Sequence, residues 1–205
     1  MFVVIDYDMG NLKSMSNALK ALEIEHEVSG DPARVCAASA IILPGVGAFA
    51  AGMQQLQQRN LDAALTEEVC GKGVPFLGIC LGMQLLAKQG YEGGVATPGL
   101  GWVDGEVHRL QPAAGERLPH VGWNEVKLRR ESGLFAQCTG TDFYFVHSYH
   151  VLCRNEEQVL GTTDYAGGFV SALHTNNIFG VQFHPEKSQR LGLQLLKNFL
   201  QGAKC

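Results

Sequence analysis

The amino-acid sequence predicts one three-layer α/β domain over residues 1–205, with helices on both faces of a mixed, mainly parallel sheet. Two patterns predict this fold. Short continuous apolar runs, such as Phe2–Ile5 and Ala40–Leu43, are typical of parallel strands that are covered on both faces. Apolar residues spaced three to four apart, as in 12–22, indicate amphipathic helices between them. A chain of 205 residues can bury a substantial core but is too short for two ordinary domains.

Strands and helices are predicted to alternate through the N-terminal part of the chain. The helix over 12–22 has leucines and a methionine on one face, and Asn11 stands at its N-cap position. The turn 29–32 contains Gly, Asp and Pro, which favour turns. In order, the predicted elements are a strand at 2–5, a helix at 12–22, a strand at 24–28, a short helix ending at Val35, a strand at 40–43, and one or two helices within 49–70.

The remainder of the chain is richer in predicted strands. Residues 158–163 and 169–174 are expected to pair in antiparallel fashion across a glycine-containing turn. The last helix, 188–200, places leucines and a phenylalanine on one face, which we expect to pack on the sheet. The predicted strands are 74–77, 102–110, 123–128, 142–151, 158–163, 169–174 and 179–183, and the predicted helices are 83–88 and 188–200.

The segment Gly78–Gly82 places a cysteine, Cys80, between two glycines where a strand is predicted to pass into a helix. This is the nucleophile-elbow pattern with Cys in place of Ser. The turn is tight, and a Cβ on either flanking residue would crowd the neighbouring backbone. A thiol at a helix N-terminus is favoured as thiolate. The alternative is a buried and inert core cysteine, because free cysteine is usually buried.

His184-Pro185-Glu186 follows the last predicted strand and supplies the partners that a nucleophilic cysteine needs. Residues two apart on an extended chain point to the same side, and Pro185 keeps the link extended. His184 can then act as the base while Glu186 orients it. An isolated histidine at a strand end is more often structural, but the triplet combined with the elbow favours a catalytic triad of Cys80, His184 and Glu186.

Composition excludes several other classes of function. The chain has 20 acidic and 16 basic residues, a net charge of −4, which does not favour binding to nucleic acid or to an anionic membrane. Its six cysteines are scattered and form no C-x-x-C, so neither a disulfide framework nor a metal site is expected. We expect no cofactor and a cytoplasmic location, because reduced thiols suit the cytosol and Asp6 comes too early for a signal peptide.

At these residues a family resemblance emerges. The sequence resembles the class I (triad) glutamine amidotransferases, and among them the glutaminase subunits of imidazole glycerol phosphate synthase, over nearly its whole length. One motif departs from the family, which usually has Gly where this chain has Asp8. The resemblance implies a flavodoxin-like topology. It is carried by Asp6–Leu12, Pro44–Gly47, Cys80 with Gln84, His120–Asn124, Phe145–Tyr149 and His184–Ser188.

Hydrolysis of a carboxamide by a thiolate forms a tetrahedral oxyanion, which two backbone N–H groups usually stabilise. One should be the amide of Leu81, directly after the nucleophile. The other should come from Val46 or Gly47 in the glycine-rich loop, although an ordinary β-to-α turn is the alternative interpretation there. The family resemblance implies that this loop rearranges when the partner subunit carries its substrate.

The resemblance also implies a glutamine-binding set around the elbow. Glu92 would face the α-ammonium group of glutamine, although most loop glutamates are merely solvated. Gln84, one helical turn after Cys80, faces the same cleft. His147 and His150 together do not suggest a metal, because no acid or thiol at suitable spacing completes a site. The full set of implied substrate-binding residues is Gly45, Gly82, Gln84, Glu92, His147, Ser148 and Tyr149.

A (β/α)8-barrel cyclase is the partner that the resemblance implies, in a heterodimer that makes imidazole glycerol phosphate and AICAR for histidine biosynthesis. The chain has no phosphate-binding glycine motif of its own, in keeping with a donor subunit that supplies ammonia. Trp123 could instead fill the core, and Lys187 could be a solvated surface residue. The implied interface residues are Asn11, Trp123, Asn124, Tyr144 and Lys187.

Three alternative functions remain open from the sequence. The chain could be the amidotransferase subunit of another synthase. It could be a stand-alone Cys hydrolase such as a γ-glutamyl hydrolase, but those usually lack the acid after His-Pro, so Glu186 argues against this class. It could also be a non-catalytic subunit that only scaffolds a partner, against which the intact triad argues.

Overall fold

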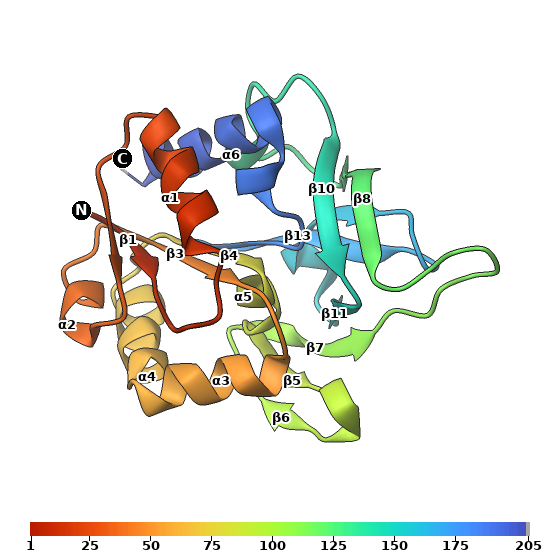
Figure 1. The fold of residues 1–205 in the computed structure, drawn as a ribbon, viewed down its shortest axis with the longest axis horizontal. Helices are drawn as coiled ribbons and strands as arrows, with labels where there is room; N and C mark the ends of the chain where they lie inside the picture. Colours follow the sequence, from red (N-terminus) through yellow and green to blue (C-terminus); the bar gives the residue numbers. More distant parts are fainter. Residues whose placement is uncertain (204–205) are drawn as a thin grey trace.

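An eight-stranded sheet runs through the centre of the computed structural model, which describes residues 1–203 (Figure 1). The strand order is β2-β1-β3-β4-β14-β13-β12-β9. Strands from β2 to β14 in this order pair in parallel, and the remaining pairs are antiparallel. The predicted α/β fold with a mixed sheet is confirmed, and so is the predicted antiparallel pair of β12 and β13.

The strands are β1 (Phe2–Ile5), β2 (His26–Ser29), β3 (Ala40–Gly45), β4 (Phe76–Cys80), β5 (Ala87–Gly90), β6 (Thr97–Pro98), β7 (Val103–Arg109), β8 (His120–Glu125), β9 (Lys127–Leu128), β10 (Asp142–His147), β11 (Tyr149–Cys153), β12 (Val159–Thr163), β13 (Phe169–Thr175) and β14 (Ile178–Val181). The helices are α1 (Leu12–Ala21), α2 (Pro32–Val35), α3 (Phe49–Gln58), α4 (Leu61–Thr66), α5 (Leu81–Gln84) and α6 (Gln189–Gly202). A π-helical turn, Glu67–Gly71, extends α4, and short 3-10 turns include Pro185–Lys187.

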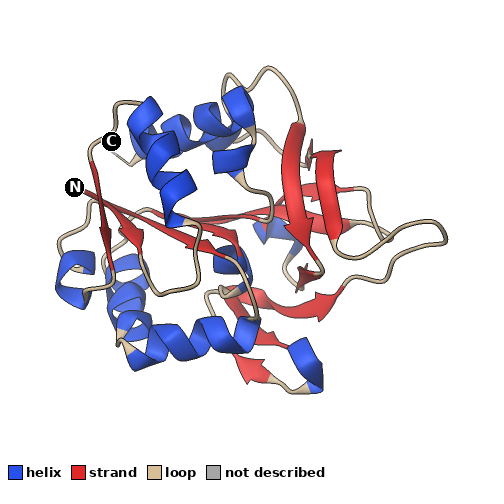
Figure 2. Cartoon of the chain, viewed as in Figure 1, coloured by secondary structure: helices blue, strands red, loops and turns tan. Residues whose placement is uncertain are grey.

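Helices cover both faces of the central sheet (Figure 2). On one face, α1 and α6 bury residues such as Leu19 and Leu196 against the strands. On the other face, α3 and α4 bury Leu56 and Leu65 in a second apolar cluster. The two clusters follow directly from the leucine spacing in the sequence. No helix within residues 1–203 is both long enough and apolar enough to cross a lipid bilayer.

Two smaller sheets flank the central one and were not predicted. Strands β10 and β8 pair alone, while β11, β7, β5 and β6 form a four-stranded sheet. The predicted strand 142–151 is therefore wrong as one element, because it breaks at Ser148 and its halves join different sheets. The predicted helix 83–88 ends early at Gln84, since Ala87–Gly90 pairs with β7 and β6 instead. Tertiary pairing overrides local helix propensity there.

The turn between β4 and α5 has the strained backbone expected of a nucleophile elbow. Cys80 has φ 54° and ψ −109°, a conformation that costs free energy for any residue with a Cβ. The flanking glycines are sterically required, as predicted. A Cβ on Gly82 would lie 1.9 Å from the carbonyl oxygen of Leu43, and one on Gly78 would lie 2.6 Å from that of Gly82.

We predict that Gly82→Ala destabilises the fold by about 3 kcal/mol or more, because the added methyl group overlaps backbone that cannot move cheaply. The matched control is Gly202→Ala, at the end of α6, where an added Cβ meets nothing within 4 Å. Its unfolding free energy should stay within about 0.5 kcal/mol or rise. Chemical denaturation measures both, and an unchanged midpoint for Gly82→Ala would contradict the steric argument.

Candidate active site

Adjacent parallel strands bring Cys80 and the His184 segment together. Cys80 is the last residue of β4, and Val181 at the end of β14 pairs with Ile79. Gln182, the first residue after β14, then lies next to Cys80, with its Nε2 3.5 Å from the sulfur, and His184 follows two residues later. The site lies at the carboxyl ends of the strands, where open α/β sheets place their active sites.

His184 and Glu186 form a buried pair. Nδ1 of His184 lies 2.8 Å from Oε1 of Glu186, and the two side chains are 2% and 3% exposed. The backbone around them is held from several sides: the N–H of His184 donates to Tyr144 O at 2.8 Å, and the hydroxyl of Ser188 donates to His184 O at 2.7 Å. The imidazole is therefore fixed in orientation by the carboxylate and by strand β10.

The Cys80 thiol and the His184 imidazole are electrostatically coupled. Burial lowers the pKa of His184, but the nearby negative charge of Cys80, followed by the hydrogen bond and charge of Glu186, raises it to about 10. Nε2 of His184 nevertheless makes no geometrically sound hydrogen bond among residues 1–203. Cys80 and His184 therefore interact through their charges, without a hydrogen bond between them. Catalytic hydrogen bonds often tighten only when substrate binds.

Gln182 is a neighbour of Cys80 that the sequence analysis missed. Its Nε2 lies 3.5 Å from the sulfur of Cys80, and the sulfur in turn lies 4.0 Å from Val146 O. Gln182 is fully buried and Cys80 is only 6% exposed. A signal was available in the sequence: Gln182 stands two residues before His184 on an extended segment, so both side chains point to the same side.

The candidate oxyanion loop follows β3, whose last residue, Gly45, pairs with Cys80. The N–H of Val46 donates to Met9 O at 2.6 Å, so this candidate donor is occupied by the loop after β1. Gly47 has φ +102°, a conformation that glycine adopts at little cost. Leu81 is the first residue of α5, so its N–H has no acceptor within the helix.

Gly45 lies where no side chain fits, because a Cβ there would be 2.3 Å from the hydroxyl oxygen of Tyr7 and 2.8 Å from the nitrogen of Gly82. The Tyr7 hydroxyl is buried and makes no hydrogen bond among the described residues. Burial, and then the charge of Cys80, raises the pKa of Tyr7 well above its usual value, so the phenol stays neutral.

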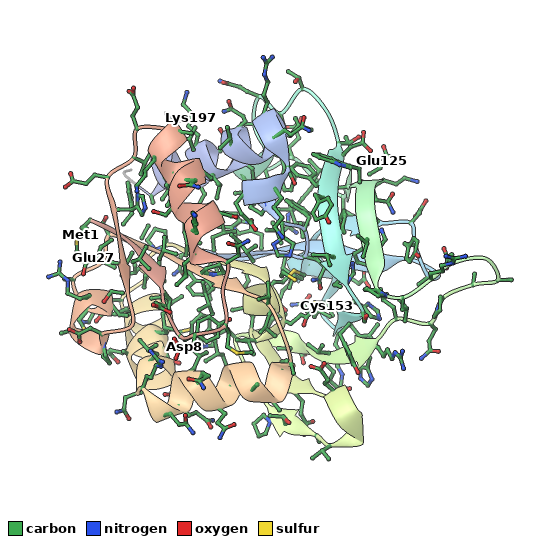
Figure 3. The ribbon with its side chains drawn as sticks, viewed as in Figure 1. Met1, Asp8, Glu27, Glu125, Cys153 and Lys197 are labelled. Carbon is green, nitrogen blue, oxygen red and sulfur yellow. The ribbon has the colours of Figure 1, made fainter. Side chains whose placement is uncertain are left out.

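Asp8, which stands where the family usually has Gly, has a backbone conformation that suits glycine. Its φ is 63°, in the left-handed region that glycine adopts freely and aspartate tolerates. Asp8, labelled in Figure 3, follows β1, and its carboxylate accepts a hydrogen bond from Arg59 on the turn after α3. Asp8 thus has a backbone conformation that glycine would also adopt, and its side chain adds a surface ion pair.

Gln84 and Glu92 have internal partners in this structure. Nε2 of Gln84 donates to Tyr149 O at 2.9 Å and to Oε1 of Gln182 at 3.0 Å. Oε2 of Glu92 accepts the N–H of Phe49 at 2.6 Å, at the N-terminus of α3. A carboxylate there is stabilised by the free amides and the helix dipole. Gln84 is therefore linked to Cys80 through Gln182, and Glu92 lies at the far end of the candidate oxyanion loop.

The segment His147–Tyr149 connects β10 to β11. Nδ1 of His147 donates to Tyr149 O at 2.9 Å, and Nε2 lies 3.0 Å from Nδ1 of His120. Both ring nitrogens are thus used within the protein, and only backbone of this residue remains for a substrate. Burial lowers the pKa of His147 to about 3, so the ring is neutral. Ser148 O accepts the N–H of Leu110 at 2.9 Å.

The expected interface residues fall into two groups. Trp123 on β8 and Tyr144 on β10 lie side by side with ring centroids 6.1 Å apart, and Nζ of Lys187 lies 5.8 Å from the Tyr144 ring. Trp123 is 48% exposed. Asn124 points inward, with Nδ2 3.3 Å from Nε2 of His120. Asn11 caps α1 by accepting the N–H of Ser14 at 3.2 Å.

Hollows and clusters elsewhere do not compete with this site. A hollow of about 760 Å³ lies next to the starts of β4 and β14, opposite the triad, and is lined by residues such as Arg130, Asn177 and Phe199. Ser132 and His174 both line it, but the hydroxyl of Ser132 accepts the N–H of Leu134 at 3.3 Å and Nε2 of His174 lies 2.8 Å from Asn176 O. Among the described residues, this serine and this histidine are therefore not paired as a nucleophile and its base. Within residues 1–203, no three His, Cys, Asp or Glu side chains gather in a way that could hold a metal ion.

Comparisons with known proteins agree with the geometry. The family model "Glutamine amidotransferase class-I" matches residues 3–203. The chain belongs to the class I glutamine amidotransferases. It is 53% identical to "Imidazole glycerol phosphate synthase subunit HisH" of Moorella thermoacetica, over 96% of this chain and 92% of that protein. It is 44% identical to the protein of the same name from Streptococcus mutans, over 98% of each.

A solved structure supports the fold of this amidotransferase. A GMP synthase subunit from Thermoplasma acidophilum superposes with a TM-score of 0.73, covering 99% of this chain and 93% of that one. The two sequences are only 16% identical, so the match concerns the fold alone. The expected flavodoxin-like order of the parallel strands, β2-β1-β3-β4-β14, is the order observed here.

The neutral state of His147 generates a stability prediction. Its pKa is about 3 in the fold and about 6.5 in the unfolded chain, so acid protonates the unfolded state first. Stability from this residue is complete above pH 6.5 and is lost as the pH falls toward 3. Between pH 7 and pH 5, His147→Asn should lose about 2 kcal/mol less unfolding free energy than the wild type.

Chemical denaturation at the two pH values measures this difference. His120 and His150, whose pKa values burial also lowers, are present in both proteins and cancel in the comparison. Equal losses in the variant and the wild type would mean that His147 is protonated in the fold.

Proposed function

We propose that this chain is the glutaminase subunit of an imidazole glycerol phosphate synthase, in histidine biosynthesis, and that Cys80, His184 and Glu186 are its catalytic triad. One observation carries the proposal: the buried His184–Glu186 pair stands beside a cysteine in a strained elbow, and the charges of that cysteine and of Glu186 raise the pKa of the imidazole. The names of the close relatives support the choice of synthase.

The chemistry starts from the coupled thiol and imidazole. His184, oriented by Glu186, takes the proton of Cys80, and the thiolate attacks the side-chain carbonyl of glutamine. The amide of Leu81 and an amide of the Val46–Gly47 loop stabilise the resulting oxyanion. The C–N bond then breaks, and His184 returns its proton to the leaving nitrogen, releasing ammonia. Water attacks the thioester, the C–S bond breaks, and glutamate leaves with Cys80 regenerated.

The resting oxyanion loop supports a role as a regulated subunit. The N–H of Val46 is bound to Met9 O and Cys80 is only 6% exposed, so the free chain is not arranged for rapid turnover. We infer that Val46 leaves Met9 and turns toward the oxyanion when the partner is engaged. A stand-alone hydrolase would have no reason to keep this donor occupied, because it would lower the rate permanently.

Glutamine recognition is proposed for the residues around the elbow. Gly45 pairs with Cys80, Gly82 follows it in the elbow, and Gln84 donates to Tyr149 O, so the glycine backbone, Gln84 and the segment His147–Tyr149 are the groups proposed to hold the substrate. Glu92 is proposed to meet the α-ammonium group once the oxyanion loop moves, since its carboxylate lies at that loop.

The partner is proposed to be a (β/α)8-barrel cyclase that docks on β8 and β10. The exposed outer side of this pair presents Trp123, Tyr144 and Val121, and Lys187 lies beside it. Val146 O on the same strand contacts the sulfur of Cys80, so this surface lies next to the nucleophile. A partner there can receive ammonia without release to water, where it would be protonated and diluted. We expect the heterodimer to act in the cytoplasm, as other biosynthetic enzymes do.

We predict that Cys80→Ala abolishes glutamine-dependent synthesis while the complex still uses free ammonia. A loss on the order of 10⁶-fold is expected for removal of a nucleophile, and Cys80→Ala with His184→Ala should be little worse, because triad residues act as a unit. The measurement is the synthase rate with glutamine or with ammonium salt. Cys36→Ser, which changes an exposed free cysteine, should leave both rates unchanged.

Glu186→Gln should lose less glutamine-dependent activity than Cys80→Ala, because Glu186 orients the base and does not react. Persistent glutamine use by Cys80→Ala would remove Cys80 from its role. Full glutaminase activity without any cyclase would favour the stand-alone hydrolase, and none with the cyclase would favour a scaffold.

We predict that Trp123→Ala weakens binding of the cyclase by about 30-fold, because exposed tryptophans are the strongest anchors of protein interfaces. Leu152→Ala is the matched control, since Leu152 is equally exposed at 48% but lies on β11, in a different sheet. Isothermal titration with the purified cyclase measures both. Unchanged affinity for Trp123→Ala would move the interface to another face.

A further inference from the structure

An unbroken set of hydrogen bonds runs from strand β8 toward the nucleophile. It begins at Asn124, whose Nδ2 lies 3.3 Å from Nε2 of His120. Nδ1 of His120 lies 3.0 Å from Nε2 of His147. Nδ1 of His147 lies 2.9 Å from Tyr149 O. Three residues on the paired strands β8 and β10 are thus tied to one backbone carbonyl.

The same carbonyl anchors the second half of the set. Nε2 of Gln84 donates one hydrogen to Tyr149 O at 2.9 Å and its other hydrogen to Oε1 of Gln182 at 3.0 Å. Gln182 then directs its own Nε2 to the sulfur of Cys80 at 3.5 Å. The two amides are therefore oriented by their partners, and neither can flip without losing two hydrogen bonds.

The chemistry of the groups assigns every proton along the set. A carbonyl only accepts, so the proton of neutral His147 lies on Nδ1, and its Nε2 is an acceptor. His120 must then donate from Nδ1, which leaves its Nε2 to accept from Asn124. Oδ1 of Asn124 accepts the N–H of Glu125 at 2.8 Å, which fixes this amide too. Asn124 thus donates to His120, His120 donates to His147, and His147 donates to Tyr149 O.

Burial makes these bonds costly to break. Gln84, Gln182, His120 and His147 are all buried, and a buried polar group without a partner is strongly destabilising. With its oxygen held by Gln84, Gln182 has its N–H group aimed at Cys80. A hydrogen bond to a charged group is worth more than one to a neutral group, so this N–H favours the thiolate.

We propose that Gln182 and His120 are positioning residues for the glutaminase reaction. Gln182 holds the sulfur of Cys80 with an N–H that stabilises the thiolate. His120 acts from further away: through His147 it fixes the Tyr149 carbonyl on which Gln84 and Gln182 are aligned. The proposal rests on Cys80 being the nucleophile of the proposed function.

The direct test is the alkylation of Cys80 by iodoacetamide in the intact chain, followed by mass spectrometry of the peptide that contains Cys80. Peptide resolution is needed because Cys36 and Cys70 are exposed. Gln182→Met keeps the volume and removes the donor, and it should slow the alkylation about tenfold. Ser171→Ala is the matched control: Ser171 is fully buried on the neighbouring β13, and its hydroxyl makes no hydrogen bond among the described residues.

Steady-state kinetics of the complex with the cyclase provide the second test. Gln182→Met should lower kcat for glutamine about tenfold while KM changes less than about twofold, because a misplaced nucleophile affects the chemical step. His120→Phe keeps the ring that stacks on Tyr165, with centroids 4.0 Å apart, but loses the donor to His147. The loss of kcat in His120→Phe should be smaller than the loss in Gln182→Met. The double variant should lose less than the product of the single losses, because both act on one set of bonds.

Thermal unfolding of each variant shows whether it folds. Gln182→Glu is a second variant, in which one carboxylate oxygen can still accept from Gln84 while the other puts an acceptor in place of the N–H donor that faces the sulfur. Unchanged or faster alkylation of Cys80 in folded Gln182→Met and Gln182→Glu overturns the role of Gln182. A double variant whose loss of kcat equals the product of the two single losses overturns the role of His120. A wild-type complex without glutaminase activity would refute the proposed function, whereas the alkylation rates would still decide whether Gln182 positions Cys80.

Discussion

The parallel pairing of β4 with β14 is the constraint on which the site depends. It brings residues about a hundred positions apart in sequence into one register, with Val181 opposite Ile79. The residues that follow, Cys80 on one strand and Gln182 and His184 on the other, then emerge at the same edge of the sheet. The elbow completes the arrangement: the strained φ of Cys80 turns the thiol out of the sheet, and glycine at 78 and 82 makes room for that turn. Neither feature would place the sulfur beside the imidazole without the other.

The structure combines a nearly assembled candidate triad with a proposed oxyanion site that is not assembled. Nδ1 of His184 and Oε1 of Glu186 are already joined, whereas the N–H of Val46 is bound to Met9 O. The two parts differ in what holds them. The triad residues lie on or beside central strands, which have no alternative packing. The Val46 peptide lies in a glycine-flanked loop, where a peptide can reorient at small cost. A partner can therefore regulate the loop without disturbing the sheet.

Much of this arrangement could be predicted from the sequence, because strong local signals specify it. The apolar runs at β1, β3 and β4, the leucine-spaced α1 and α6, and the elbow all carry their own patterns. The break at Ser148 could not be predicted, since aromatic and β-branched residues continue across it and only the pairing of β10 and β11 with different partners reveals two strands. The strand β5 was missed because Ala87 and Lys88 have high helix propensity, and only the pairing of this segment with β7 and β6 makes it a strand. The other candidate site residues were predicted from motifs. Gln182 was not predicted, because it lies within a segment whose pattern indicates only a strand.

The histidines near the site show how environment assigns different roles to one residue type. His184 and His147 influence each other electrostatically, and two positive imidazoles so close together would repel. The surroundings of the two rings give them different protonation states. His184 has the carboxylate of Glu186 and the thiol of Cys80, which favour its charged form. His147 has a backbone carbonyl and the neutral ring of His120, and burial keeps it uncharged. A neutral His147 can accept the hydrogen bond from His120 and leaves the positive charge on His184, as the proposed transfer of the Cys80 proton to this ring requires.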